Sequence, residues 1–364
     1  MRLSGTLSLY ISRQFVIGLG IVFALFVVTV FVFDTVELLR RGSGKEAATF
    51  SLLIEMAVLR IPFMAQKVLP FAALIGAILC LTRLTRTQEL IVARAAGVSV
   101  WQFLLPALTI ALLIGGFVVT AFNPFASAMV SRFEQMEGRY LQGRSSLLAV
   151  SDAGIWLRQS NGTMTDVVHA RRMARDTLTL HDVVIFRYEG DDRFIQRIDA
   201  SEATLERDRW NLTNALVTAP DRPSETYAHY QIATELTLEQ IENSFAPPET
   251  LSFWALPGFI RVLDESGFSS VRHRLYWHAT IATPLLLCAM VLIGATFSLR
   301  LTRRGGIWLL VVAGILTGFL LYFLSDLVLA LGLSGKIPAW LAAWAPAGIF
   351  SLLGVASLFY LEDG

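Results

Sequence analysis

A glycine-rich tetrapeptide is the first feature of this chain that suggests chemistry. Gly42-Ser43-Gly44-Lys45 has the form of the end of a phosphate-binding loop. The full motif also needs a glycine five residues before its last glycine and a Ser or Thr after the lysine. Leu39 and Glu46 occupy those two positions. The stretch therefore gives little support to nucleotide binding by this chain.

A second group, His273, His278, Asp264 and Glu265, raises the question of a metal or catalytic site. The spacing of these residues matches no recognised ligand or catalytic pattern, and hydrogen bonding at a membrane interface explains them more simply. The serine beside Asp326 also lacks the strand-turn-helix context of a nucleophile elbow. We expect no metal site, no cofactor and no catalytic residue, although a membrane-anchored envelope enzyme stays open as an alternative.

Asp34 and Asp326 are informative because each lies at the end of a long apolar run or close to it. A carboxylate beside a membrane span is costly unless it is paired or hydrated. With Arg40, Arg41 and Lys67, these residues are expected to line a polar rim at one membrane face, where the cations would bind the phosphates of a lipid head group. The alternative is that the basic side chains only reach the phosphates of bulk lipid.

The stretch at residues 83–100, RLTRTQELIVARAAGVSV, lies between two long apolar runs and is too charged to lie in lipid. Its apolar residues recur at helical spacing, which predicts a short amphipathic helix at about residues 84–97. Gly97 suits a left-handed C-terminal cap, and Ser99 suits the N-cap of the next helix. The charged residues are Arg83, Arg86, Glu89 and Arg94. The alternative is a solvated connector that only orients the spans.

The composition identifies the class of protein. Of the 364 residues, 54% are hydrophobic and 16% are charged, whereas charged residues make up about a quarter of an average soluble domain. The chain is therefore expected to be an integral membrane protein. The net charge of +1 argues against a nucleic-acid partner, since phosphate binding requires a concentrated cationic surface.

Six apolar segments are long enough to cross a bilayer core of about 30 Å. They are residues 15–33, 61–82, 101–122, 275–299, 307–325 and 339–361. The even number places both termini on one side. Arginines gather before the first segment, after the second and after the fourth, and the positive-inside rule makes that side cytoplasmic. Arg40, Arg41 and Lys67 then lie toward the opposite side.

A hydrophilic insert at residues 133–270 separates the first three spans from the last three. Short runs of alternating apolar and polar residues, separated by turn signals, predict a β-sandwich or jelly roll. The expected strands are residues 154–159, 164–170, 177–188, 193–198, 203–207, 210–218 and 226–235, followed by an amphipathic segment at 259–263. The expected organisation is three transmembrane helices at residues 1–132, an outer β domain at 133–270 and three further helices at 271–364.

Several motifs resemble one family of membrane proteins. They are Leu74-Ile75-Gly76-Ala77, Gln88-Glu89-Leu90 and Arg94-Ala95-Ala96-Gly97-Val98-Ser99. These motifs and the layout of the spans resemble the lipopolysaccharide-export permeases LptF and LptG. The patterns at residues 10–15 and 34–41 are more similar to LptG than to LptF. The resemblance covers essentially the whole chain, although the β insert carries little of it.

The resemblance implies a half-transporter of the bacterial inner membrane, with six transmembrane helices, cytoplasmic termini and an inserted periplasmic β-jelly-roll domain. The implied partners are an LptF-like permease, the LptB ATPase dimer, LptC and, through the bridge of β domains, LptA. The implied cargo is lipopolysaccharide. LptB would hydrolyse the ATP, so this chain would perform no covalent chemistry.

The resemblance also implies roles for single residues. The short charged helix would be the coupling helix that docks on LptB, through Arg86, Glu89, Arg94 and Gly97. The outer rim of a lipid cavity between the two permeases would contain Asp34, Arg40, Arg41, Lys67 and Asp326, with the cations facing the phosphates of lipid A. The first, second and fifth spans would line the cavity. A receptor with a β domain and a passive membrane anchor stays open as a further alternative.

Overall fold

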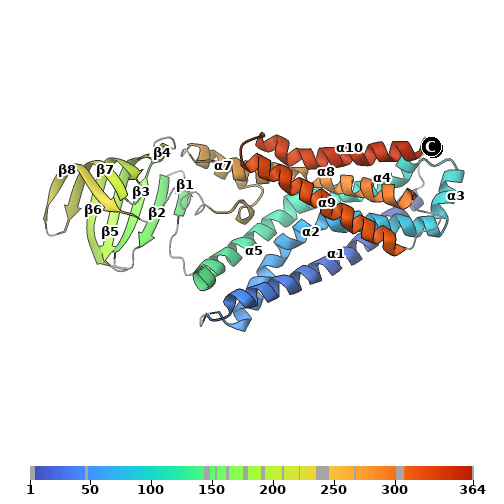
Figure 1. Cartoon of the computed structure of the whole chain (residues 1–364), viewed down its shortest axis with the longest axis horizontal. Coiled ribbons are helices and arrows are strands. Elements are labelled where there is room, and N and C mark those ends of the chain that lie inside the picture. The colour runs from blue at the N-terminus through green and yellow to red at the C-terminus, as the bar shows by residue number, and fades with distance from the viewer. Residues whose placement is uncertain are drawn as a thin grey trace. The chain divides into compact units, whose positions relative to one another are not determined.

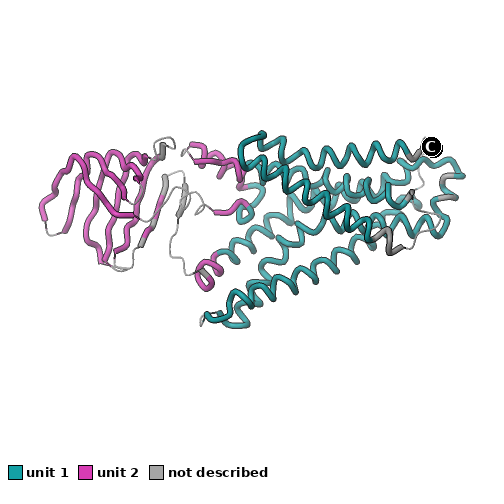
Figure 2. The backbone as a smooth tube through the Cα atoms, viewed as in Figure 1, with its two compact units in different colours: residues 1–134, 249–254, 274–364 teal, residues 135–248, 255–273 magenta. Residues whose placement is uncertain are grey.

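The structure is a computed structural model. It describes residues 5–45, 48–142, 148–151, 154–160, 164–174, 179–189, 193–206, 209–220, 222–234, 246–265, 268–300 and 307–362. The chain folds into two compact units (Figure 2), which we call the helical unit, residues 1–134, 249–254 and 274–364, and the β unit, residues 135–248 and 255–273. The chain therefore passes between the units four times, after residues 134, 248, 254 and 273. The division predicted from the sequence assigned residues 249–254 to the β domain, whereas they pack with the helices.

The helical unit contains six candidate membrane spans among the described residues (Figure 1), which confirms the predicted number. They are α1 (Gly5–Gly42), α2 (Phe50–Arg86), a composite third helix, α8 (Val271–Arg300), α9 (Ile307–Leu333) and α10 (Ala339–Glu362). In the third helix, α4 (Val100–Phe117) continues through the π-helical turn η1 (Val118–Phe122) into α5 (Asn123–Met136) and η2 (Glu137–Gln142). Most of these helices are longer than the apolar run that predicted them, because polar residues continue the helix beyond it.

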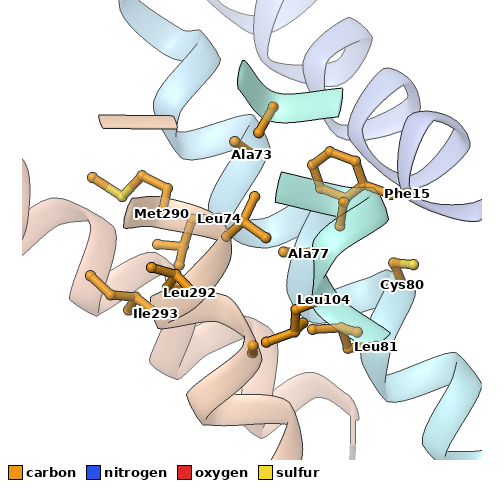
Figure 3. Close-up of a cluster of buried hydrophobic side chains, with 14 of the residues drawn as sticks. Phe15, Ala73, Leu74, Ala77, Cys80, Leu81, Leu104, Met290, Leu292 and Ile293 are labelled. Atoms are coloured by element: carbon orange, nitrogen blue, oxygen red, sulfur yellow. The ribbon is translucent and has the colours of Figure 1, made fainter. Parts of the chain in front are cut away.

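α2 is the central helix of this unit. In the most apolar window of each span, 72% of the residues are buried in α2 but only 17% in α1 and in α9. Two glycines permit the close packing. A Cβ on Gly76 would lie 2.7 Å from the Cα of Leu19 in α1, and a Cβ on Gly294 of α8 would lie 2.9 Å from the Cβ of Ala77. Figure 3 shows the apolar side chains that meet in this core.

Successive spans run in opposite directions, so the helical unit has two ends. The end that we call the α3 end carries the short helix α3 (Glu89–Ala95), and the end of α10 lies there too (Figure 1). The other end, which we call the opposite end, carries the connection between α1 and α2 and the connection between α9 and α10. The chain leaves the helical unit after α5 and re-enters it at the start of α8, both at the opposite end.

The β unit contains an eight-stranded antiparallel sheet among its described residues, which confirms a β domain between the third and fourth spans. The strands are β1 (Leu148–Ser151), β2 (Gly154–Ser160), β3 (Met164–Ala170), β4 (Arg172–Ala174), β5 (Thr179–Glu189), β6 (Arg193–Glu206), β7 (Arg209–Ala219) and β8 (Arg222–Ala233). The sheet order is β1-β2-β3-β5-β6-β7-β8, and β4 pairs with β5 beside this path. The described strands thus follow one another across a single sheet as an antiparallel meander.

Two details of the predicted strands were wrong. Residues 193–198 and 203–207 were expected as separate strands, but residues 193–206 form the single strand β6, because buried Ala200 continues the alternation and Asp199 and Glu202 stay paired with β5. Residue 207 lies outside the described residues. β1 and β4 were not predicted, since strands of four and three residues carry almost no periodic signal. Two of the turn signals between the expected strands, Asn161-Gly162 and residues 190–192, lie outside the described residues.

The β unit has its own apolar core. Trp210 is buried in the sheet, and Leu263 of the helix α7 (Leu256–Glu265), with Phe268 after it, packs in the same cluster. The predicted amphipathic segment is therefore a helix that covers part of the sheet. Near one end of β3 and β5, Arg187 donates from Nε and Nη2 to the two carboxylate oxygens of Asp166, at 2.7 and 2.9 Å. This hydrogen bonding raises the pKa of Arg187.

Candidate functional site

The charged stretch at the α3 end folds as two helical pieces. Arg83 and Arg86 lie in the last turn of α2, and Glu89 begins α3. Gln88, between the two helices, has a φ of 61°, a left-handed conformation that interrupts a helix. The helix predicted at about residues 84–97 is therefore shorter, and Arg86 lies before it instead of within it.

Glu89 holds α3 against the start of α1. Its Oε1 accepts hydrogen bonds from the Tyr10 hydroxyl, at 3.2 Å, and from Thr87 Oγ1, at 2.8 Å. A second contact joins the end of α2 to α1, because Arg83 donates to Gln14 Oε1 at 3.2 Å. The carboxylate predicted to dock on a partner therefore also has an intramolecular role. This role was not predictable from the sequence, since Tyr10 lies 79 residues before Glu89 in the chain.

α3 presents a small apolar surface to solvent. Leu90 is 3% exposed and anchors the helix in the core of the helical unit, whereas Val92 is 67% exposed. Ala95, Ala96 and Gly97 are exposed as well. Arg94 is a residue of α3 whose side chain lies outside the described part. We use the name docking face for exposed Val92, Ala95, Ala96 and Gly97, after the docking role expected of this helix from the sequence.

Both predicted caps around α3 and α4 have the expected conformation. Gly97 has a φ of 84°, the left-handed region in which glycine carries no steric cost. Ser99 caps α4 in a capping box: its side chain accepts from the Gln102 amide at 3.2 Å, and its own amide donates to Gln102 Oε1 at 3.4 Å. The connection from α3 to α4 thus has a defined cap on each side.

At the opposite end, Asp34 of α1 forms an ion pair with Arg60 of α2. Arg60 Nη1 lies 2.5 Å from Asp34 Oδ1, and the side chains are 29% and 13% exposed. The Arg60 guanidinium also lies 5.2 Å from the centre of the Phe133 ring. Arg60 was not predicted as a site residue, although it directly precedes the apolar run at residues 61–82. Asp34 is therefore neutralised mainly within the helical unit.

A small pocket lies beside this ion pair, between α1 and α2. Asp34 is its one acidic lining residue, and the other lining residues are Val27, Val30, Phe31, Ala57, Ile61, Met64 and Ala65. The pocket is too apolar to bind a charged group except through Asp34, which Arg60 already engages. Its lining suits hydrocarbon.

Arg40 and Arg41 lie in the last turn of α1 and share one carboxylate. Glu37 accepts from Arg40 Nε at 2.9 Å and from Arg41 Nε at 3.0 Å. All three side chains are exposed. The structure therefore groups these two cations with Glu37, whereas Asp34 pairs with Arg60.

Lys67 and Asp326 belong to one electrostatic neighbourhood, as the rim hypothesis requires. Lys67 is exposed, and its Nζ lies 4.5 Å from the centre of the Phe63 ring. Its charged neighbours are the carboxylates of Glu249 and Asp326 and the guanidinium of Arg60. Glu249 was not anticipated here, since the sequence placed it in the β domain.

The histidines and carboxylates near the start of α8 make ordinary contacts. Asp264 accepts from Ser270 Oγ at 2.6 Å, and His273 Nε2 lies 3.1 Å from the Ala246 carbonyl oxygen. His278 packs against the ring of Trp277. Among the residues that the structure describes, no three His, Cys, Asp or Glu side chains lie together in a way that could hold a metal ion.

Comparison with known proteins adds to these observations. The model of the family described as lipopolysaccharide export system permease LptF/LptG matches residues 9–360. The chain is 24% identical over 365 residues to the lipopolysaccharide export system permease protein LptG of Haemophilus influenzae, covering 96% of each chain. It is 25% identical over 311 residues to the protein of the same name from Escherichia coli strain K12, covering 82% of each. With its six apolar helices, the chain is a multi-pass inner-membrane protein that belongs to the LptF/LptG family of lipopolysaccharide export permeases, in which it is most like LptG.

Proposed function

We propose that this chain is the LptG-type subunit of an ATP-driven lipopolysaccharide exporter. It pairs with an LptF-like permease, takes its energy from an LptB ATPase dimer, and passes the lipid to LptC and LptA. The docking face on α3 carries this proposal. A helix anchored by buried Leu90 and by the Tyr10–Glu89 hydrogen bond, with an exposed apolar surface, is built to transmit force from a partner to the helical unit.

The orientation follows from the charges on the α3 end. Arg13, Arg83 and Arg86 lie at this end, and the positive-inside rule places it in the cytoplasm. Both termini are then cytoplasmic, and the β unit, which the chain enters from the opposite end, is periplasmic. The ATPase is therefore proposed to reach α3 from the cytoplasm.

The lipid is proposed to lie against α1, α2 and α9. α1 and α9 bury the smallest share of their apolar windows, so they have the most surface available for acyl chains. At the opposite end, Arg40, Arg41 and Lys67 supply the cations, and Asp34 and Asp326 lie close to this region. Arginine side chains bind phosphate in a bidentate manner, which suits the phosphates of lipid A.

Copurification tests the proposal. Glu89→Lys reverses the charge at the first residue of α3, next to the docking face. We expect it to reduce recovery of the ATPase with the chain while membrane insertion stays intact. Tyr10→Phe is the matched control, because it removes the hydrogen bond between Tyr10 and Glu89 but keeps the carboxylate. Reduced recovery with Glu89→Lys but not with Tyr10→Phe supports docking. Equal recovery of the ATPase with wild type and both variants contradicts it and favours a receptor with a passive anchor.

A further inference from the structure

The helix that runs from the Ser99 cap to the β unit contains a π-helical turn near its middle, where the regular backbone hydrogen bonding is interrupted; we call this interruption the break. The π-helical turn η1 ends directly before Asn123 and Pro124 of α5. In a regular α-helix the amide of residue 124 would donate to the carbonyl of Thr120, but proline has no N–H. The Trp254 indole donates from Nε1 to that carbonyl oxygen, at 3.1 Å. A side chain distant in sequence thus provides a donor at the break.

Asn123 connects the same break to three other segments. It is 1% exposed. Its Oδ1 accepts from the Phe253 amide at 2.8 Å, and its Nδ2 lies 3.4 Å from the Tyr276 hydroxyl of α8 and 3.5 Å from Gln66 Oε1 of α2. A buried amide with partners on several elements fixes their relative positions, because an unsatisfied buried polar group is costly.

The rings of this region add apolar contacts. Phe253 stacks on Trp277 of α8, with ring centres 6.3 Å apart and an angle of 13° between the planes, and it packs edge-on against Trp254. Residues 249–254 are therefore held to the helical unit by two hydrogen bonds and by stacking. We call these residues the clasp.

The path of the chain connects the clasp to the β unit on both sides. The chain leaves the β unit after Pro248, contributes the clasp to the helical unit, and returns to the β unit at Ala255. The helix that receives the clasp begins at the Ser99 cap beside α3. Its α5 part runs to the point where the β unit begins. One continuous helix thus connects the docking face, the clasp and the entry to the β unit.

We propose that the clasp transmits movement of the α4–α5 helix to the β unit, with Asn123 and Trp254 as its positioning residues. The inference rests on the proposed function, in which the ATPase moves α3 and lipid is delivered at the opposite end. The clasp also begins at Glu249, a charged neighbour of Lys67. A lipid phosphate bound at Lys67 would therefore lie next to the element that moves.

The first experiment measures the clasp itself. Hydrogen–deuterium exchange of the full chain in lipid nanodiscs is expected to be slow at the Phe253 amide and to accelerate in Asn123→Ala, which removes its acceptor. Trp254→Phe keeps an aromatic ring but lacks the indole N–H donor, and it is expected to accelerate exchange across the clasp. Trp340→Phe is the control, since Trp340 is also an exposed tryptophan at the opposite end. Fast exchange of the Phe253 amide in the wild type would show that the clasp is not held to Asn123. That result would overturn the clasp independently of the proposed function.

The second experiment measures coupling in the assembled transporter. In proteoliposomes, the amount of lipopolysaccharide passed to a soluble LptA acceptor per ATP hydrolysed is expected to fall roughly fivefold or more in the Asn123→Ala, Trp254→Phe double variant, the lower end of typical coupling between sites. ATP hydrolysis and recovery of the ATPase are expected to stay at the wild-type level. An unchanged ratio of lipid to ATP overturns the coupling role, whereas a wild-type chain that recovers no ATPase overturns the proposed function instead.

Discussion

Asp34 of α1 and Arg60 of α2 form an ion pair in which the carboxylate is 13% exposed and the guanidinium is 29% exposed. The two residues come from different helices, and both lie near the end of a predicted membrane span. The pair brings a negative charge near a membrane surface at acceptable cost, since an unpaired charge in this position would be strongly destabilising.

Removing one partner of this pair is expected to destabilise the helical unit. Asp34→Leu leaves Arg60 uncompensated, with an expected loss of about 2 kcal/mol, below the roughly 3–5 kcal/mol of a fully buried pair. The double variant Asp34→Leu, Arg60→Met should recover most of the loss. Unfolding in mixed micelles measures both. The exposed pair of Glu55 and Arg132 is the control, and Glu55→Ala is expected to change stability by less than about 1 kcal/mol.

The packing of α1 on α2 predicts the effect of a single methyl group. Gly76→Ala would place a Cβ 2.7 Å from the backbone of Leu19, so the helices must separate, and we expect a loss of about 1–3 kcal/mol. Gly20→Ala, in α1, is the control because nothing lies within 4 Å of its Cβ position. Equal unfolding midpoints for the two variants would show that α1 does not pack on α2 in this way.

The rim hypothesis predicts a charge effect on lipid binding. Lys67→Glu adds a third carboxylate to the neighbourhood of Glu249 and Asp326, and we expect it to reduce photocrosslinking of lipopolysaccharide to the assembled transporter. Lys336→Glu makes the same change at another exposed lysine, in the connection between α9 and α10. If both variants crosslink equally well, Lys67 only contacts bulk lipid.

The arginine pair of α1 is tested separately. Arg40→Glu with Arg41→Glu would place three carboxylates in one turn, because both arginines now share Glu37. We expect lipid-stimulated ATP hydrolysis to fall, since the cations that attract phosphate become repulsive. Glu37→Gln removes the negative charge that pairs with both guanidinium groups, and it is expected to leave the stimulation intact or raise it. If lipid-stimulated ATP hydrolysis also falls in the Glu37→Gln variant, the loss in the arginine variant results from altered folding of α1 and not from lost phosphate binding.

One tyrosine of the β unit predicts a pH dependence. The hydrogen bond from Tyr227 to Glu225 raises the pKa of the Tyr227 hydroxyl. A raised pKa means that the contact is fully present at neutral pH and is lost as the pH rises through the folded-state value. The ultraviolet titration of Glu225→Gln should therefore show one tyrosine that ionises at lower pH than in the wild type. Identical titration curves would contradict the contact.

Much of the fold was predictable because long periodic signals carry it. Six apolar runs gave six spans, and the alternation in β3 gave its bounds, residues 164–170, without error. β6 was split because a run of polar residues hid the buried Ala200, and β1 was too short to detect. Local caps such as Ser99 were predictable, since their partner lies three residues away.

Contacts between distant residues could not be predicted from this one sequence. Glu89 was recognised as a charged residue of the loop, but its bond to Tyr10 depends on how α1 packs. Lys67 and Asp326 share one electrostatic neighbourhood, whereas Arg40 and Arg41 pair with Glu37 and Asp34 pairs with Arg60. One signal in the sequence was left unused: the Asn-Pro dipeptide at residues 123–124 marks a missing backbone donor in a helix, which another segment can replace.

The four passages of the chain between the units also bear on how this protein can be divided or recombined. Excising the β unit with one splice, from residue 135 to residue 273, would remove the clasp along with it, so Asn123 and the Thr120 carbonyl would lose the partners that the clasp provides. A graft that exchanges the β unit between relatives must therefore carry a Phe-Trp pair compatible with the recipient's helix. The β unit and the clasp therefore have to be exchanged together.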